Sequence, residues 1–204
     1  MQIIKGIGAN PIPVFFGVTM IYYRLADETL PARFLHEIAH AFLAELLKKH
    51  YGIENYRIEK TEHGKPFLPD YPHIHFNLSH CKGLIVCGFS ESEIGVDAEL
   101  IRPYNGRAAK RIFSHEEMEY TEKSSTPDET FFRFWTLKEA LGKNIGTGLS
   151  SSLSEVTFQL VGENPQCEAY PQKSFVQKII QKKWVVSICT DNPFCVINRN
   201  AFYS

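Results

Sequence analysis

Two stretches of the chain decide its fold: Ile94-Gly95-Val96-Asp97-Ala98-Glu99 and Phe134-Trp135-Thr136-Leu137-Lys138-Glu139-Ala140-Leu141-Gly142-Lys143. Asp97 and Glu99 are spaced i, i+2, so on a strand both carboxylates point to one side. Glu139 and Lys143 are spaced i, i+4, so on a helix they share a face. If this strand and this helix pack together, three carboxylates converge beside a lysine. Hard oxygen ligands next to a cation suit a Mg²⁺ ion that carries a phosphate ester, so the pattern points to phosphate chemistry.

Each stretch alone also has a plainer interpretation. The two strand carboxylates are compatible with a solvated strand edge. Glu139 and Lys143 are compatible with a surface ion pair that contributes a few tenths of a kcal/mol. Only the combination favours a site.

Composition limits the possible functions. The chain has 204 residues, 44% of them hydrophobic, and a net charge of −1, so it can bury a core but has no broad basic field for nucleic acid. The N-terminus lacks the features of a signal peptide, and the longest apolar run, residues 12–23, is too short to span a bilayer. The five cysteines form no CxxC pair, which favours reduced thiols and a cytoplasmic location. We expect no membrane partner.

Hydrophobic periodicity and turn residues predict the elements. A helix is expected from Leu30 to His50, with Pro31 in its first turn and Gly52 at its end. Two more are expected to begin at Ser114 and Thr126, which both have capping-box spacing. Strands are expected at residues 2–8, 12–23, 56–62, 74–80, 84–89, 93–99, 155–161, 175–180, 184–189 and 194–197, with 84–89 and 93–99 forming a hairpin.

This order predicts an α+β fold made of two similar halves, residues 1–90 and 91–204, with the second half carrying the acids. Ile7-Gly8-Ala9 weakly echoes Ile94-Gly95-Val96-Asp97, which hints at an internal duplication. Apolar and polar residues alternate strictly in the predicted strand at residues 74–80. Its polar side, which includes Asn77 and Ser79, is either a functional edge or simply a solvent-exposed one.

Six motifs in order make the sequence resemble the 4′-phosphopantetheinyl transferases of the surfactin-synthetase-activating type. They are Gly64-Lys65-Pro66, Asn77 to His80, Ile94 to Glu99, Phe113 to Glu117, Trp135 to Lys143 and Gly146 to Ser150. The resemblance implies a pseudo-twofold pair of α+β halves with coenzyme A in the cleft between them. It also implies transfer of the phosphopantetheine arm of coenzyme A to a serine of an apo acyl or peptidyl carrier protein, releasing adenosine 3′,5′-bisphosphate.

The resemblance also implies roles for single residues. Asp97, Glu99 and Glu139 would hold Mg²⁺, with Glu139 as the base for the incoming serine and Lys143 on the phosphate oxygens. The expected coenzyme A contacts come from Gly64, Lys65, Pro66, Ser79, His80, Lys138, Lys143 and Arg33. Lys138 points to a different helix face from Lys143, so its expected contact is either phosphate or the carrier. Because both halves lie in one chain, a monomer is expected.

The first long helix departs from the family pattern. Relatives place several Lys or Arg residues there for the 3′-phosphate of coenzyme A, whereas residues 31–41 offer only Arg33, His36 and His40, with Ala41 where an arginine is common. The same helix matches the zincin signature His36-Glu37-x-x-His40, so a zinc metallopeptidase is one alternative function. A non-catalytic relative that binds coenzyme A or a carrier is another.

Overall fold

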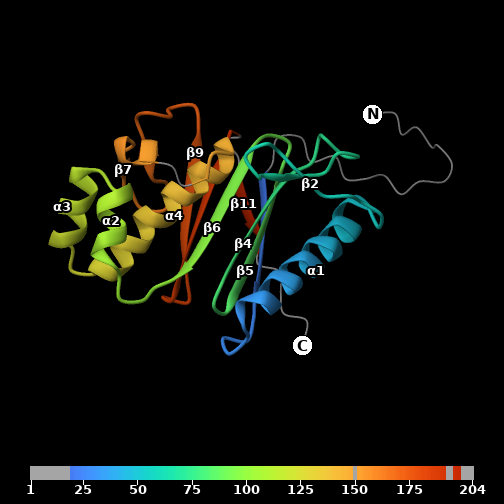
Figure 1. Ribbon diagram of the computed structural model, residues 1–204, viewed down its shortest axis with the longest axis horizontal. Helices are drawn as coiled ribbons and strands as arrows, with labels where there is room; N and C mark the ends of the chain where they lie inside the picture. Colours follow the sequence, from blue (N-terminus) through green and yellow to red (C-terminus); the bar gives the residue numbers. More distant parts are fainter. Residues whose placement is uncertain (1–18, 149–150, 192–194, 199–204) are drawn as a thin grey trace, which may run out of the picture.

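The computed structural model describes residues 19–148, 151–191 and 195–198 (Figure 1). Two main sheets hold seven of the strands, in the orders β11-β1-β5-β4 and β6-β10-β9, and two short pairs, β2-β3 and β7-β8, hold the rest. The elements are β1 (Thr19–Leu25), α1 (Ala32–Tyr51), β2 (Glu59–Lys60), β3 (Pro66–Phe67), β4 (His75–Cys81), β5 (Leu84–Ser90), β6 (Ile94–Leu100), α2 (Gly106–Ile112), α3 (His115–Lys123), α4 (Pro127–Ile145), the 3-10 helix η1 (Ser151–Glu155), β7 (Phe158–Gln159), β8 (Gln166–Cys167), β9 (Ser174–Ile180), β10 (Trp184–Thr190) and β11 (Cys195–Asn198).

One β-α-β-β arrangement occurs twice along the chain. In the first copy β1 precedes α1, and β5 lies between β1 and β4, antiparallel to both. In the second copy β6 precedes α4, and β10 lies between β6 and β9, again antiparallel to both. The predicted α+β fold with two similar halves is therefore confirmed.

The end of the described chain returns to the first copy. Strand β11 pairs in parallel with β1, so residues 195–198 belong to the first sheet rather than the second. A division at residues 90 and 91 stays a prediction. The echo at Ile7-Gly8-Ala9 lies outside the described residues, and the described counterpart of β6 is β1.

The two sheets lie between the two long helices. Helix α1 packs on β4 and β5, whereas α4 packs on β6 and β10, and Figure 1 shows the strands between them. Alternate strand residues such as Ile21, Val86, Val96 and Val186 form a core between the sheets. The central strands β5 and β10 therefore each present one face to the other sheet and the second face to a helix.

Both long helices begin and end as their flanking residues predict. Pro31 caps α1 and Pro127 opens α4, and Gly52 and Gly146 end the two helices in the left-handed region, at φ 67° and 81°. Among the described residues, no helix has the length and apolar character needed to cross a membrane.

Other predicted elements differ from the structure. The predicted hairpin of residues 84–89 and 93–99 is wrong, because β5 pairs with β1 and β4 whereas β6 pairs with β10. Helix α2 was not expected. Within the predicted strand at residues 155–161 only β7 is a strand, and within that at 56–62 only β2 is. Ser114 and Glu117 form the predicted capping box, but the Thr126 side chain makes no cap hydrogen bond. The predicted strand at residues 2–8 lies outside the described residues.

Candidate active site

Asp97 is the centre of a polar cluster on the face of β6 that meets α4. The residue is 5% exposed, and its Oδ1 accepts hydrogen bonds from Lys143 Nζ at 2.7 Å and from Ser79 Oγ at 3.1 Å. Lys143 also donates to the Val96 carbonyl at 3.0 Å. Asp97 Oδ2 is buried and has no hydrogen-bond partner within the described part of the chain. A buried carboxylate oxygen without a partner is costly, so this atom marks a place where a donor or a cation would bind favourably.

Side chains of β4 attach it to β6, although the two strands belong to different sheets. Asn77 Oδ1 accepts from the Val96 amide at 2.9 Å, and Ser79 Oγ accepts from the Ala98 amide at 3.1 Å. These bonds satisfy amides on the edge of β6 that would otherwise be buried without acceptors. The polar side of β4 is thus buried, and it joins the halves at the point where Asp97 lies.

Two further carboxylates are electrostatically coupled to Asp97. Burial, reinforced by the Asp97 charge, raises the pKa of Glu139 to about 7, and Lys143 opposes this shift. Burial and the Asp97 charge likewise raise the pKa of Glu99, which is opposed by Arg102, whose Nη1 lies 2.9 Å from Glu99 Oε2. The three predicted acids therefore share one electrostatic environment, and Glu139 has a pKa suited to taking and returning a proton near neutrality.

A cavity of about 250 Å³ lies beside this cluster and is lined by both halves. The first half contributes Gly64, Lys65, Pro66 and neighbouring residues, and the second contributes Lys143 and glycines near the end of α4. Four of the residues predicted to contact coenzyme A therefore line this cavity. Its lining is His63, Gly64, Lys65, Pro66, Asn77, Leu78, Gly142, Lys143, Gly146 and Gly148.

Three histidines lie together where α1 meets β4. The rings of His36 and His40 have centroids 4.5 Å apart, and the His80 ring is 5.9 Å from that of His36. Burial, followed by the charges of His36, Lys143 and His40, lowers the pKa of His80. Arg33 lies at the exposed start of α1, with its guanidinium 4.8 Å from the centroid of the Phe34 ring.

The structure corrects the expectation for Lys138. This side chain is fully buried, and its ammonium pairs with Glu117 Oε2 at 2.8 Å and donates to the Leu153 and Val156 carbonyls. All three of its protons have acceptors within the core, so it contacts neither phosphate nor a carrier. That it points away from Lys143 is confirmed.

Two other residues predicted to contact coenzyme A are already engaged within the protein. The Ser79 hydroxyl is 6% exposed and bonds Asp97, the Ala98 amide and Lys143. The Lys65 ammonium pairs with the Glu93 carboxylate and donates to the Asn144 carbonyl at 2.7 Å. The sequence had given Glu93 and Asn144 no role, because neither lies at a recognisable motif position.

The donor set of the acidic cluster fits a hard divalent cation in its chemistry. Asp97, Glu99 and Glu139 supply carboxylate oxygens, and Asp97 Oδ2 lacks any other partner. In the arrangement described, however, no group of three or more His, Cys, Asp or Glu side chains is placed to hold a metal ion. The same finding applies to His36 and His40, where the sequence had suggested zinc.

Known proteins resemble this chain in sequence. Residues 93–189 match the family model of the 4′-phosphopantetheinyl transferase superfamily. The chain is 34% identical over 139 residues to the 4′-phosphopantetheinyl transferase Sfp of Bacillus subtilis (strain 168), covering 63% of this chain and 62% of Sfp. It is 30% identical over 156 residues to a second 4′-phosphopantetheinyl transferase of Bacillus subtilis, covering 72% of this chain and 70% of that protein.

The coverage of these relatives is partial. The matches span less than two thirds of the length of Sfp and of psf-1 from Bacillus pumilus, at 62% and 59%. Among solved structures, the holo-[acyl-carrier-protein] synthase of Thermotoga maritima is similar at 20% identity and a TM-score of 0.41, over 48% of this chain and 62% of that one.

Proposed function

We propose a reaction for this chain from one premise: it belongs to the 4′-phosphopantetheinyl transferase superfamily. The proposed reaction moves the phosphopantetheine arm of coenzyme A to a serine hydroxyl of an apo acyl or peptidyl carrier protein and releases adenosine 3′,5′-bisphosphate. The observation that carries the proposal is the cluster of Asp97, Glu139 and Lys143 beside a cavity that both halves line.

Asp97, Glu99 and Glu139 are the residues that we propose to hold Mg²⁺. A divalent cation bound to these carboxylates supplies charge neutralisation for the pyrophosphate of coenzyme A. Asp97 Oδ2, which is buried without a hydrogen-bond partner among the described residues, supports this assignment. The pKa values of Glu99 and Glu139 are raised first by burial and then by the Asp97 charge, and a bound cation would offset both effects. Glu99 then exchanges its ion pair with Arg102 for the cation.

The remaining roles follow from the environment of each side chain. With a pKa raised to about 7, Glu139 is suited to accept the proton of the carrier serine as its oxygen attacks the β-phosphorus. Lys143 neutralises Asp97 in the present arrangement and is the cation of the cluster that also lines the cavity. We propose that it turns to the phosphate oxygens and stabilises the negative charge that develops on the leaving group.

The same structure bears on the oligomeric state and the location of the protein. The site is built from both halves of one chain, so we propose a monomer. The free cysteines of the described chain, Cys81, Cys87, Cys167 and Cys189, support a reducing, cytoplasmic location.

Mass spectrometry of intact carrier proteins tests the reaction. Purified protein is incubated with coenzyme A, Mg²⁺ and several apo carriers, and the expected result is a gain of one phosphopantetheine on a carrier serine that EDTA abolishes. Asp97→Ala and Glu139→Ala should each lower the rate by at least about a hundredfold while the circular dichroism spectrum is unchanged. Near wild-type turnover by either variant contradicts the assignment.

Glu119→Gln is the matched control. Glu119 is an exposed acid on α3 that forms an ion pair with Lys123, so its loss should leave transfer unchanged. Coenzyme A binding without any transfer would favour the non-catalytic alternative. Tight stoichiometric zinc would favour the metallopeptidase alternative.

A further inference from the structure

The ammonium of Lys65 joins the two halves of the molecule at one end of the cavity. Lys65 lies just before β3, in the first half, and its side chain is only 13% exposed. Its Nζ pairs with Glu93 Oε2, at the start of β6, and donates to the Asn144 carbonyl, in the last turn of α4. Both acceptors belong to the second half, so one side chain connects three elements.

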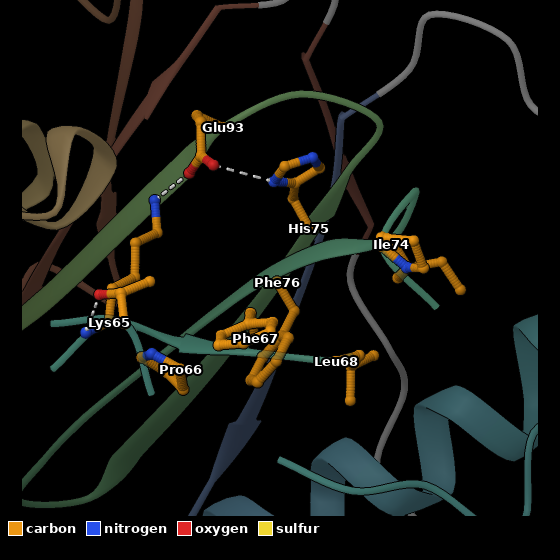
Figure 2. A pocket seen from close by; sticks show the side chains of 10 residues that line it. Lys65, Pro66, Phe67, Leu68, Ile74, His75, Phe76 and Glu93 are labelled. Carbon is orange, nitrogen blue, oxygen red and sulfur yellow. Dashed lines mark hydrogen bonds and ion pairs between the residues drawn. The ribbon is translucent and has the colours of Figure 1, made fainter. Parts of the chain in front are cut away.

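Glu93 extends this connection to a second strand of the first half. Its Oε1 lies 3.2 Å from His75 Nδ1 on β4, and its backbone carbonyl accepts from Asn144 Nδ2 at 2.8 Å. Figure 2 shows Glu93 between Lys65 and His75, on the rim of a pocket of about 230 Å³ whose wall includes Pro66 and Phe67. The Lys65 end of the ion pair is therefore largely buried, whereas the Glu93 side chain is 46% exposed.

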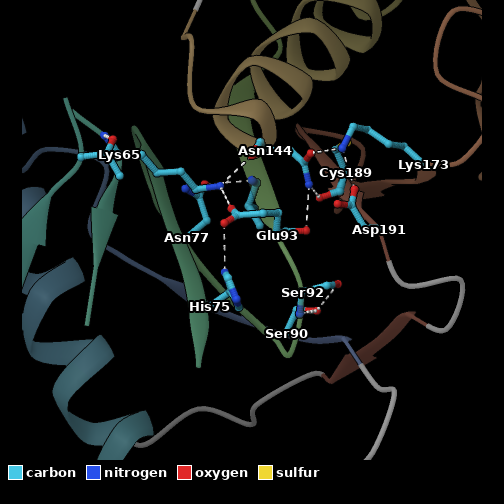
Figure 3. Close-up of polar contacts among 12 residues, drawn as sticks. Lys65, His75, Asn77, Ser90, Ser92, Glu93, Asn144, Lys173, Cys189 and Asp191 are labelled. Atoms are coloured by element: carbon cyan, nitrogen blue, oxygen red, sulfur yellow. Dashed lines mark hydrogen bonds and ion pairs between the residues drawn. The ribbon is translucent and has the colours of Figure 1, made fainter. Parts of the chain in front are cut away.

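The last turn of α4 is held by these contacts from several directions. Carbonyls at the C-terminal end of a helix lack helical donors, and Lys65 supplies one to Asn144. The Asn144 side chain donates to the Glu93 and Cys189 carbonyls and accepts from Lys173 Nζ at 2.6 Å, as Figure 3 shows. Lys143 directly precedes this residue, so whatever fixes Asn144 also fixes the backbone of Lys143.

A direct role for Lys65 on phosphate is disfavoured by the same contacts. To reach a ligand, its ammonium would have to leave both a carboxylate and a helix carbonyl. The pKa of Glu93 is lowered to about 2, first by His75 and also by Lys65, so the carboxylate remains ionised near neutrality. Leaving it without its cation would be unfavourable.

We propose that Lys65 and Glu93 form a clamp across the cleft that positions Lys143, and that Lys65 is a positioning residue rather than a ligand of the phosphates. That Lys143 contributes to turnover by contacting the phosphates rests on the proposed function. Misplacing a substrate-binding group by a fraction of an ångström lowers turnover, because the phosphate oxygens then meet their cation in a poorer geometry.

A double-mutant cycle separates the clamp from direct binding. Lys65→Met, Glu93→Gln and the double variant are compared in carrier transfer by kcat and by the KM for coenzyme A. For the clamp, each single variant should lower kcat/KM by about tenfold, and the double variant should be no more than about threefold worse than either. If Lys65 binds phosphate directly, Lys65→Met should raise the KM for coenzyme A while Glu93→Gln is close to wild type, and that result overturns the proposal.

Amide hydrogen exchange gives a readout that does not depend on activity. Peptides covering residues 139–148 should exchange faster in both single variants, whereas a peptide within α1 should be unchanged. Unchanged exchange at residues 139–148 overturns the clamp, whether or not the wild-type protein shows transfer. Absence of transfer by the wild-type protein contradicts the proposed function and is a separate result. Unchanged kinetics with lowered stability also overturn it, because they indicate a purely structural pair.

The matched control is the ion pair of Lys178 and Glu163. It joins β9 to the loop between β7 and β8, and its two side chains are 40% and 61% exposed. Lys178→Met and Glu163→Gln change charge in the same way as the clamp variants. They should alter neither the exchange at residues 139–148 nor the KM for coenzyme A.

Discussion

Lys138 and Lys143 lie on the same helix and have opposite surroundings. Lys138 is enclosed by the core with its charge matched by Glu117, whereas Lys143 lies at the cavity and bonds Asp97. Burial lowers the pKa of Lys138, and the Glu117 charge opposes this shift. The first lysine therefore serves the fold, and the second is available for chemistry.

The two lysines should respond differently to truncation. Lys138→Met leaves the Glu117 carboxylate buried without its cation and is expected to lower the free energy of unfolding by about 3 kcal/mol. Lys143→Met also leaves a carboxylate, that of Asp97, without its cation, but Lys143 is 27% exposed at the cavity, so we expect a smaller loss of stability while transfer is abolished. Urea denaturation monitored by fluorescence measures both. Equal stability losses would contradict the separation.

Spacing alone predicted that these lysines face different ways, but not which one is buried. Which face of a helix is buried depends on the elements that pack against it. Lys138 contacts Glu117 on α3 and the carbonyls of Leu153 and Val156. These groups are distant in sequence, so their convergence is a tertiary result. The Asp97 and Glu99 pair was predictable because strand alternation is local.

The contact of α4 with β6 depends on a glycine. A Cβ on Gly95 would lie 1.9 Å from the Ala140 carbonyl oxygen and 2.4 Å from the Asn144 amide, so only glycine allows the helix backbone to approach the strand. This approach brings Glu139 and Lys143 to the carboxylate of Asp97. The glycine of the Ile-Gly-Val-Asp motif thus determines how closely α4 approaches β6 at the site.

Gly95→Ala should test this packing. The added methyl group would collide with backbone atoms, so we expect α4 to shift outward and the free energy of unfolding to fall by about 2 kcal/mol or more. Gly106→Ala is the control, because its Cβ would meet nothing closer than 3.9 Å. Thermal denaturation compares the two. A wild-type melting temperature for Gly95→Ala would show that the helix is not held by this contact.

At the level of elements, the sequence predicted the long helices well and the strand partners poorly. Periodicity and the flanking Pro31, Gly52 and Gly146 are local signals, and they marked α1 and α4 closely. The partner of β6 is β10, which follows it only after three helices, and no local pattern indicates such a pairing. The false hairpin arose because Ser90-Glu91-Ser92 looks like a turn, although residues 91–93 carry the chain from one sheet to the other.

At the level of the whole molecule, two similar halves are joined through side chains. Asn77 and Ser79 of β4 accept hydrogen bonds from backbone amides of β6. Glu93, just before the start of β6, pairs with both Lys65 and His75. None of these bonds belongs to a backbone ladder. These polar contacts therefore add to the apolar core that packs the two sheets together.

Stability should depend on pH through one of these residues. The pKa of Glu93 is lowered from 4.5 to about 2, so its carboxylate stabilises the fold above pH 4.5, and this contribution is lost as the pH falls toward 2. Because 46% of the side chain is exposed, we expect only about 1 kcal/mol of difference between wild type and Glu93→Gln near neutrality. Urea titrations at a series of pH values should show this difference shrinking in acid. A constant difference would contradict it.

Strand β11 has a consequence for how the chain is made on the ribosome. Its partner β1 is among the first described residues to be synthesised, yet β11 comes after every other element. Until residues 195–198 leave the exit tunnel, β11 cannot pair with β1, so this edge of β1 lacks that partner. Unpaired strand edges readily pair with other chains. Nascent chains stalled before that point should therefore need more help from chaperones than the finished protein.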